Sequence, residues 1–524
     1  MGKISLLDCT LRDGGYINDW NFGEQKIKGI CKRIAQTGIE FIEVGFIKGD
    51  KFDPNRSVFP DVESISKLIA PKSSKLKYVA MLDMSAPVPL DRIPPCDGTS
   101  IDGIRVIFKK EKIDEGFAYC KRIKELGYWL SVNFVGTDLY SDKEFIEGIE
   151  KFNSIKPDTM VIVDSFGLIK RKHFLRLVYI ADNNMDPDIM LSYHAHNNLQ
   201  QAFGNAEALV DLNLKRDICI DACVFGMGRG AGNLNLELFA EYMNENYDTN
   251  YRLEPMLEIM DEYLEEIYRK KQWGYSLPLY LSASNGCHPN YAIYIAEKDS
   301  LNVKSFNEYL KSIPNEEKAK FSKDKAEKYY KEYQDKYVDD KKIVAKFGDL
   351  LANKEIFILA PGMSLLKNEK QIKDSINKTD SVVFALNFNP KEFNVDYVFS
   401  SNIKRFSKLK DINPNSLILS SNVEAGDAYE NIINYASYIS NHSDIIDNSG
   451  LMLIKFLIAA GVKKVHIAGM DGYSVSNQSN YYDSTLEYDF SNQIALRNEL
   501  ITKELQVLSQ HVELEFVTPT EYYI

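Results

Sequence analysis

The chain has no long apolar run among its 524 residues. A helix that crosses a bilayer needs about 20 consecutive apolar residues. The longest apolar stretch, Leu451–Val462, is shorter than that and contains Lys455. The chain also begins without the basic and apolar segments that are typical of a signal peptide. We therefore expect a cytoplasmic protein without a membrane span.

Cysteine pairs are absent as well. The seven cysteines are scattered along the chain, and none of them forms a Cys-x-x-Cys motif. Most of them lie in apolar segments, where cysteine packs as a small hydrophobic residue. In a chain of this length, the pattern indicates reduced thiols in a cytoplasmic protein.

Positive charge is the third deficit, because 63 Lys and Arg residues face 75 Asp and Glu residues and leave a net charge of −12. A surface of that sign repels polyanions, so we do not expect nucleic acid as a partner. A small anionic substrate is compatible with this charge, since a metal ion or a few local cations can outweigh the global field.

Apolar residues make up 44% of the chain and supply material for more than one large core. From residue 3 to about 240, short β-rich segments alternate with amphipathic helical segments. This α/β alternation predicts a parallel sheet, and eight units in this length favour a closed (β/α)8 barrel over an open doubly wound sheet. The predicted strands are Ile4–Asp8, Phe41–Phe46, Tyr78–Asp83, Gly103–Phe108, Trp129–Phe134, Thr159–Val163, Ile189–His194 and Ile218–Val224.

Three parts are predicted in all. The barrel is expected over residues 1–245, and a helical extension with a charged connector over residues 246–350. A second alternation begins near residue 353 and predicts a smaller Rossmann-like α/β domain over residues 351–524. Its predicted strands are Glu355–Ala360, Ser381–Leu386, Tyr397–Ser400, Ser416–Leu419, Lys464–Ala468 and Val512–Val517, with a helix over Leu451–Ala460.

Two histidines and one aspartate are the strongest candidates for chemistry. His194 and His196 are two residues apart at the end of the seventh strand, so both side chains can point to the same side of an extended segment. Asp13 follows the first strand, and in a closed barrel the first and seventh strands flank the eighth. We therefore expect the three residues to bind one divalent cation, Mn²⁺ or Mg²⁺ ahead of Zn²⁺ or Fe²⁺. Ordinary loop histidines are the alternative.

Other polar side chains also fall where predicted strands end, which is where barrel enzymes carry their active sites. Glu43, Asn133 and Asp164 are expected to contact substrate, and turn formation is the alternative. Arg12 has a planar fork of donors that can stabilise an enolate oxygen, with a salt bridge at the barrel mouth as the alternative. The glycine-rich segment Gly226–Asn233 permits close backbone approach and can cradle an anion, with Asn233 as a further substrate contact or ligand.

These motifs resemble those of the metallolyase barrel superfamily, which includes 4-hydroxy-2-oxovalerate aldolase, 3-hydroxy-3-methylglutaryl-CoA lyase and isopropylmalate synthase. The resemblance covers roughly the first 300 residues, and it is carried by Asp8–Gly14, His194–Asn197 and Gly230–Asn233. It implies that Asp13, His194 and His196 bind the metal and that Arg12 stabilises an enolate. Asn233 matches a position that binds metal only in the lyase branch.

The 4-hydroxy-2-oxoacid aldolases look most similar, with one departure. They carry a catalytic histidine soon after the Arg-Asp pair, where this chain has Tyr16. A tyrosine with an ordinary pKa of about 10 is a poorer base near neutral pH. We therefore predict that either Tyr16 or His288 moves the proton of the aldol hydroxyl.

The C-terminal domain weakly resembles bacterial sialyltransferase-like proteins of the Rossmann type. The resemblance is carried by Ala360–Leu365, Asn387, Asn402, Ser449–Gly450 and Ile467–Tyr473. A Gly-Ser turn after a strand can offer backbone N–H groups to a phosphate. The resemblance implies a nucleotide-sugar site, and a domain without a ligand is the alternative. The candidate residues are Gly362, Ser364, Asn387 and Asp471.

The predicted activity is that of a metal-dependent carbon–carbon lyase, an aldolase that works through the enolate of pyruvate. Its expected partners are a 2-oxo acid, an aldehyde and further copies of the chain in a homo-oligomer. The aldehyde is expected to derive from a sugar in surface-polysaccharide biosynthesis. Two alternatives remain open: a Claisen-type acyl-CoA condensing enzyme on the same barrel, and a nucleotide-sugar-dependent glycosyltransferase-like protein with a non-catalytic barrel.

Overall fold

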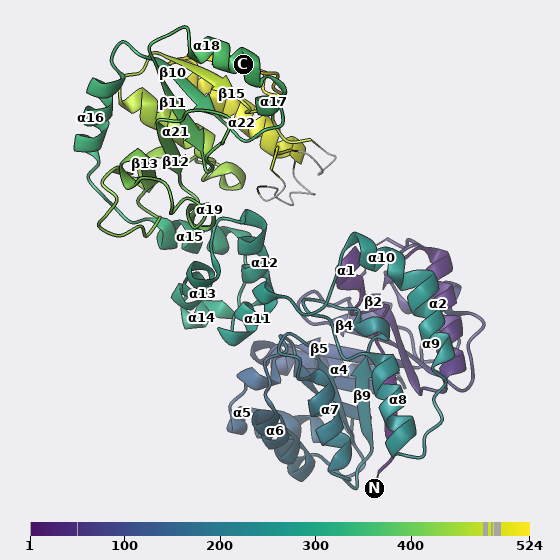
Figure 1. Cartoon of the computed structure of the whole chain (residues 1–524). Coiled ribbons are helices and arrows are strands. Elements are labelled where there is room, and N and C mark those ends of the chain that lie inside the picture. Colours follow the sequence, from purple (N-terminus) through teal and green to yellow (C-terminus); the bar gives the residue numbers. More distant parts are fainter. Residues whose placement is uncertain (1, 50, 475–479, 484–485, 487–493, 524) are drawn as a thin grey trace. The chain divides into compact units, whose positions relative to one another are not determined.

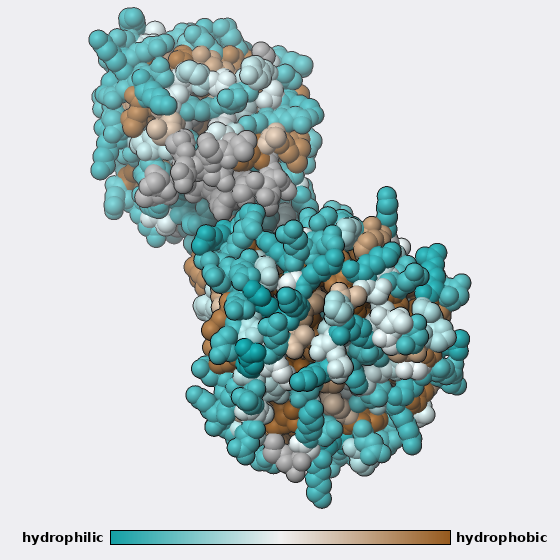
Figure 2. Space-filling view, turned by 90° about the vertical axis from the view of Figure 1, so that its right-hand side faces the viewer, coloured by the Kyte–Doolittle hydropathy of each residue, from teal (hydrophilic) through white to brown (hydrophobic). Residues whose placement is uncertain are grey.

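The computed structural model describes the chain except for residues 1, 50, 475–479, 484–485, 487–493 and 524. The chain divides into two compact units, Met1–Pro289 and Asn290–Ile524 (Figure 1). Within the described ranges, no helix has both the length and the apolar character needed to cross a membrane. The face shown in Figure 2 is mainly hydrophilic, as expected for units that bury their apolar residues in cores.

The first unit is a closed (β/α)8 barrel, which confirms the predicted fold. Neighbouring strands are parallel, and β1 pairs with both β2 and β9, so the sheet closes on itself. One short extra strand, β3 (Val58–Phe59), pairs with β2. The barrel strands are β1 (Ile4–Asp8), β2 (Phe41–Ile47), β4 (Lys77–Asp83), β5 (Gly103–Phe108), β6 (Trp129–Phe134), β7 (Thr159–Asp164), β8 (Met190–Ala195) and β9 (Ile218–Ala222).

Amphipathic helices follow the barrel strands. The helix α2 buries Ile27, Ile30 and Ile34, whose spacing of three and four residues places them on one face. The helix α5 begins with a capping box in which Ser141 and Glu144 satisfy each other's backbone amides. The helices of the barrel are α1 (Gly15–Asn18), α2 (Glu24–Thr37), α3 (Val62–Ile69), α4 (Ile113–Glu125), α5 (Asp142–Asn153), α6 (Arg171–Asn184), α7 (Ala202–Asp211) and α8 (Leu236–Asn246).

The first unit ends after Pro289, beyond the predicted barrel boundary at residue 245. The reason is that the next helices pack against α2 rather than leaving the barrel. Arg33 of α2 lies 3.3 Å from the carboxylate of Glu258, and Lys26 lies 2.7 Å from that of Glu266. These elements are α9 (Glu254–Ile259), a π-helical turn (Met260–Leu264) and α10 (Glu265–Lys270), followed by α11 (Leu277–Ser284).

The second unit contains helices and a seven-stranded parallel sheet, which is the predicted α/β domain. The helix α15 was expected to be a solvated connector, but it buries Tyr330 and Gln334 within this unit. The helices before the sheet are α12 (Pro289–Lys298), α13 (Val303–Ser312), α14 (Asn315–Lys318), α15 (Lys323–Gln334) and α16 (Lys341–Leu351).

The sheet of the second unit has the order β14-β13-β12-β11-β10-β15-β16, so the chain reverses its direction of winding between β10 and β15. Such a switch point leaves a crevice at the carboxyl ends of the strands, where open α/β sheets bind ligands. The strands are β10 (Glu355–Leu359), β11 (Ser381–Leu386), β12 (Tyr397–Ser400), β13 (Leu417–Ser420), β14 (Ile432–Ile433), β15 (Lys464–Ala468) and β16 (Glu513–Phe516). The helices are α17 (Ser364–Lys367), α18 (Glu369–Ile376), α19 (Ile403–Phe406), α20 (Tyr435–Tyr438), α21 (Ser449–Ala459) and α22 (Ile494–Leu508) (Figure 1).

Candidate functional site

Three predicted metal ligands come together at the carboxyl end of the barrel. Asp13 Oδ2 lies 2.9 Å from His194 Nε2 and 3.8 Å from His196 Nε2. One donor atom from each residue lies within 4.8 Å of the other two. The three side chains are buried, with exposed fractions of 0%, 6% and 9%. Their convergence follows from strands β1 and β8, which both pair with β9.

The loops that carry these ligands are fixed by hydrogen bonds to their own backbones. The Asp13 amide donates to the Cys9 carbonyl, and Trp20 Nε1 donates to the Arg12 carbonyl, both within 2.8 Å. On the other side, His196 forms a bridge with Asn233, and the Asn197 amide donates to the Gly232 carbonyl. The glycine-rich loop after β9 therefore packs directly against the His-Ala-His segment.

The donor set fits a divalent cation. In the described part of the chain, the buried Asp13 Oδ1 and Asn233 Oδ1 have no hydrogen-bond partner. Such atoms are costly unless a ligand or water satisfies them. Burial lowers the pKa of His196 to about 4, with Asp13 opposing the shift, so this imidazole is neutral near pH 7. A carboxylate and a neutral imidazole are ordinary ligands of Mn²⁺, Zn²⁺ or Fe²⁺.

Opposing effects act on the other two ligands. Burial favours neutral Asp13, but Arg12 and the imidazoles outweigh burial and hold the pKa of Asp13 well below its usual value. Burial also disfavours a charged His194, yet its hydrogen bonds to Asp13 and Asp221 raise its pKa well above the usual value. A cation that binds His194 Nε2 must therefore displace a proton.

Two arginines connect the carboxylates beneath the ligands. Arg12 donates from Nη1 to Asp13 over 2.8 Å and from Nε to Glu43 over 2.7 Å. Glu43 also lies 3.2 Å from Arg105 Nη1. All four side chains are at most 7% exposed, so these ion pairs act with little screening by solvent. Glu43, a predicted substrate contact, thus holds both arginines.

Asp221 closes this network into a ring. Arg105 donates from Nη2 to Asp221, and Asp221 Oδ2 lies 3.2 Å from His194 Nδ1. The opposite nitrogen of that imidazole faces Asp13, so the carboxylate fixes which ring nitrogen points toward the ligand cluster. Sequence reasoning missed Arg105 and Asp221. The available signal was a charged residue inside an otherwise apolar strand, in β5 and β9 respectively.

Breaking the ring at Arg105 should destabilise the fold. Arg105→Met leaves Glu43 and Asp221 buried without their shared cation, which costs roughly 3–5 kcal/mol. Urea unfolding of both proteins measures this loss. Arg122→Met is the control, because Arg122 pairs with Glu125 on the surface of α4, and exposed pairs contribute about 1 kcal/mol or less. Equal effects of the two substitutions would contradict the assignment.

Asp221 should act on metal affinity rather than on ligation. Asp221→Asn weakens the acceptor that orients His194, so we expect Mn²⁺ affinity to fall roughly 10- to 100-fold. Competition with a chromogenic chelator measures the dissociation constant. Asp217→Asn, an exposed position just before the same strand, provides the control. An unchanged affinity for the Asp221 variant would remove this residue from the site.

The remaining strand-end residues have different surroundings. Asn133 accepts from Ser131 and donates to the Val106 carbonyl, and its Oδ1 lies 3.5 Å from Arg105 Nη2, so it adjoins the ring. The Asp164 carbonyl accepts the His196 amide over 3.1 Å, but the Asp164 side chain bonds to its own turn. Both of its carboxylate oxygens accept backbone amides of the turn after β7, from Leu168 and Ile169.

The buried carboxyl group of Asp164 should make the free energy of unfolding depend on pH. Burial raises its pKa to about 7, although the backbone amides of the turn oppose the shift. This value exceeds the roughly 3.9 of an unfolded aspartate, so the stabilisation linked to its proton is full below about pH 4 and is lost as the pH rises through 7. We expect the free energy of unfolding of the wild type to fall relative to Asp164→Asn between about pH 5 and about pH 8. Urea unfolding at both values tests this, and a constant difference would contradict it.

Tyr16 and His288, the predicted proton carriers, lie on either side of Arg229. The guanidinium of Arg229 is 5.7 Å from the centre of the Tyr16 ring, and its Nη2 is hydrogen bonded to His288 Nε2. Burial raises the pKa of Tyr16, so this phenol is protonated near pH 7. Burial, with Arg229 and Lys109, lowers the pKa of His288 to about 3. Neither side chain is charged near pH 7, and the role of either one as the proton carrier stays a prediction.

The second unit has a cavity of about 140 Å³ at the switch point of its sheet. Three of the four residues predicted for a nucleotide site line it, namely Gly362, Asn387 and Asp471, and the site itself stays a prediction. Asp471 accepts hydrogen bonds from both the amide and the hydroxyl of Ser364. A phosphate at the Gly-Ser turn would therefore have to displace the Asp471 carboxylate, because the Ser364 amide is already engaged.

The comparisons with known proteins concern the barrel. The model of the HMGL-like family matches residues 3–262. The chain is similar to the 4-hydroxy-2-oxovalerate aldolase of Geobacillus genomosp. 3, with 24% identity over 46% of this chain and 70% of that enzyme. The enzyme of the same name from Moorella thermoacetica is 24% identical over 53% of this chain and 82% of its own. The solved N-terminal domain of a candidate aldolase from Bacteroides vulgatus is 27% identical, with a TM-score of 0.47, over 55% of this chain and 95% of that domain.

Proposed function

The barrel half of this chain belongs to the HMGL-like family of carbon–carbon lyases, and from that premise we propose that it is a divalent-metal-dependent aldolase working through the enolate of pyruvate. One observation carries the proposal. Arg12 is held through Nε and Nη1, while its Nη2 makes no hydrogen bond within the described ranges. This buried guanidinium therefore keeps a donor available beside Asp13 and His194.

The reaction needs charge stabilisation at the keto oxygen of the 2-oxo acid. A divalent cation held by Asp13, His194 and His196 would supply Lewis-acid polarisation of that keto group. Arg12 contributes N–H donors to the negative charge that develops as the enolate forms. Glu43 and Asp13 keep the guanidinium in place before substrate arrives, so little reorganisation is needed during the reaction.

Proton movement falls to Tyr16 in this proposal. Its hydroxyl is protonated near neutral pH, and its ring is fixed against Trp20 at 4.8 Å and Phe46 at 6.3 Å between ring centres. In the direction of bond formation, the methyl proton of pyruvate leaves to solvent as the enolate forms. Tyr16 donates a proton to the alkoxide that forms from the aldehyde and regains a proton from solvent. In the direction of cleavage, the phenolate accepts it back from the aldol hydroxyl.

Exchange of the methyl protons of pyruvate in D₂O tests the enolate without any knowledge of the aldehyde. We expect NMR to show exchange with Mn²⁺ or Mg²⁺ and its loss after chelation. Absence of exchange with any of Mn²⁺, Mg²⁺, Zn²⁺ and Fe²⁺ would refute the proposal. Exchange of acetyl-CoA protons instead would favour the Claisen-type alternative.

The cavity of the second unit supports a second proposal, a site for a nucleotide-sugar. Its position at the switch point of a parallel sheet is typical of nucleotide sites. Together with the barrel, it is consistent with a sugar-derived aldehyde in surface-polysaccharide biosynthesis. Calorimetric titration with CMP and UDP-sugars tests this site. Binding that is lost in Asn387→Leu supports it, and no binding of any nucleotide would leave the cavity without this role.

A further inference from the structure

Arg229 lies near the metal cluster but plays no part in the charge ring. It belongs to the glycine-rich loop after β9 and is only partly buried. Its guanidinium lies over the face of Tyr16 and is hydrogen bonded to His288 Nε2, and its charge contributes to the lowered pKa of His196. Tyr16 and His288 are uncharged near pH 7, so they hold the guanidinium in position without neutralising it.

No carboxylate of the described residues lies within ion-pair distance of Arg229. The buried carboxylates nearby are already paired, since Arg12 contacts Asp13 and Glu43, and Arg105 contacts Asp221. A guanidinium carries five N–H donors, and the bond to His288 is the only hydrogen bond of this side chain in the described part of the chain. Arg229 therefore offers several aligned donors and a full positive charge in a protein whose net charge is −12.

Other cations share this region. Tyr16, Trp20 and Phe46 form one aromatic cluster, with ring centres 4.8–6.3 Å apart. Arg229 lies over Tyr16, and Lys48 lies 4.3 Å from the centre of the Trp20 ring. The region also contains a negative charge, because Asp83 contributes to the raised pKa of Tyr16. Arg229, however, contacts the Tyr16 ring and forms no ion pair with Asp83 in the described part of the chain.

The candidate metal ligands are less exposed to solvent than Tyr16, which lies near them. Asp13 is fully buried, His196 is 8% exposed and Tyr16 is 37% exposed. Arg229 lies against Tyr16 and is itself partly exposed, so it is closer to solvent than the three buried ligands. Arg12 already serves the enolate oxygen in the proposed function. The group that Arg229 can contact is thus the end of the aldehyde that is remote from the new carbon–carbon bond.

We propose that Arg229 binds an anionic group at the remote end of the aldehyde, so that the substrate class is an aldehyde bearing a carboxylate or a phosphate. This inference rests on the proposed aldolase function and specifies its acceptor. The planar fork of a guanidinium matches both oxyanions with two parallel hydrogen bonds. His288 is a positioning residue, because its neutral Nε2 orients the guanidinium without competing for the anion.

Matched aldehydes test the acceptor class. Succinic semialdehyde is compared with butanal, and glyceraldehyde 3-phosphate with glyceraldehyde, each in aldol addition to pyruvate. We expect kcat/KM to be at least about 10-fold higher for the charged member of one pair, because hydrogen bonds between ionised groups are stronger than those to a neutral group. The two pairs distinguish carboxylate from phosphate. Equal or better use of both neutral aldehydes would overturn the proposal.

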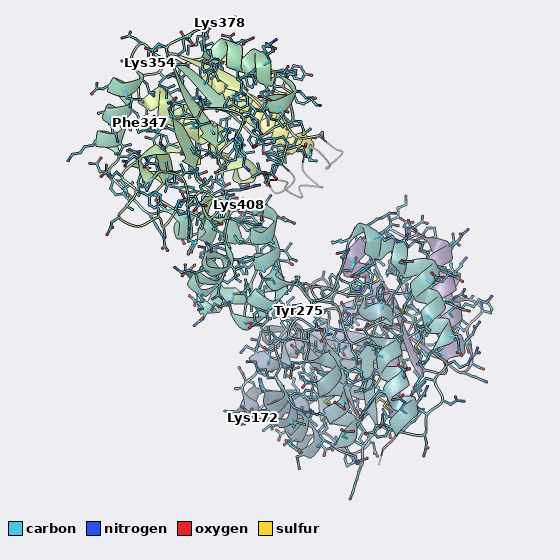
Figure 3. All side chains as sticks on the ribbon, viewed as in Figure 1. Lys172, Tyr275, Phe347, Lys354, Lys378 and Lys408 are labelled. Atoms are coloured by element: carbon cyan, nitrogen blue, oxygen red, sulfur yellow. The ribbon has the colours of Figure 1, made fainter. Side chains whose placement is uncertain are left out.

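Substitutions at Arg229 test whether this residue causes the preference for a charged aldehyde. In Arg229→Gln the ratio of charged to neutral kcat/KM should fall to about 1, while Arg229→Lys should keep an intermediate ratio. Lys172→Gln is the control, because Lys172 lies at the outer surface on α6 (Figure 3). A ratio in Arg229→Gln that equals the wild-type ratio would overturn the assignment to this residue.

A binding measurement separates failure of this inference from failure of the aldolase proposal. Calorimetry should show glycerol 3-phosphate or succinate binding to the wild type and not to Arg229→Gln, with glycerol as the uncharged control. Pyruvate proton exchange by the wild type reports the aldolase function independently. If the wild type exchanges pyruvate protons but binds neither anion, the acceptor proposal is wrong. If Arg229→Gln loses proton exchange to the same degree as aldol addition, Arg229 serves pyruvate and the proposal is also wrong.

Discussion

Asp13→Asn should abolish pyruvate proton exchange, with a rate at least about 1000-fold below that of the wild type. The carboxylate is the only anionic member of the ligand cluster, and its amide replacement lowers the charge that holds a divalent cation. Loss of Lewis-acid stabilisation of several kcal/mol corresponds to a factor of this size. Mass-spectrometric metal analysis of the purified variant should show a matching loss of bound metal.

The matched control is Asp19→Asn. Asp19 lies six residues later, at the end of α1, and its side chain is 82% exposed beside Arg56. This substitution should change neither metal content nor exchange. If Asp13→Asn retains metal and exchange, then the three side chains do not form the active centre. Loss of metal without loss of exchange would mean that the enolate forms by a route in which the cation is not required.

The sequence predicted the barrel because each strand stands out on its own. Segments such as Gly103–Phe108 and Trp129–Phe134 are short, rich in β-branched or aromatic residues and bounded by polar turns, and the observed strands β5 and β6 coincide with them. Strands of two residues lack such a pattern. Both β3 and β14 were therefore missed, since their pairing depends on neighbours that only the folded chain provides.

The meeting of the three candidate metal ligands was predictable for a similar reason. The spacing of His194 and His196 is local, and closure of the barrel brings Asp13 to them. The supporting ring was not predictable, because the meeting of Arg105 and Asp221 depends on which side of each strand faces the barrel interior. A polar residue at the end of a strand can form a turn or belong to a site, and its position in the sequence does not distinguish the two roles. Asp164 illustrates this, since it satisfies two amides of its own turn.

In the second unit, contacts between residues far apart in the sequence could not be predicted. Gly362 and Ser364 follow a strand, as the residues of a phosphate-binding turn do. The order of the amino acids does not reveal that the Ser364 amide donates its hydrogen bond to Asp471. The contact arises because β10 and β15 are neighbours in the sheet, 107 positions apart at this pair. A crossover of that kind is a property of topology, and periodicity does not reveal it.

Arg12→Lys should lower the rate of pyruvate proton exchange roughly 100- to 1000-fold while leaving metal content nearly unchanged. One arginine performs three tasks here: Nε holds Glu43, Nη1 holds Asp13, and Nη2 keeps a donor for the developing charge. A lysine has a single nitrogen and cannot span those positions. Removal of one preorganised donor to a developing oxyanion costs a factor of that size.

The expected signature of Arg12→Lys is a fall in the saturated exchange rate that exceeds any change in Mn²⁺ affinity, because the lysine charge still faces both carboxylates. Arg176→Lys is the control, since Arg176 pairs with Asp142 at the exposed start of α5 and α6. Parallel loss of metal and exchange in Arg12→Lys would make Arg12 a structural support of Asp13. An exchange rate equal to that of the wild type would remove Arg12 from the stabilisation of the enolate, and with it the observation on which the proposed chemistry depends.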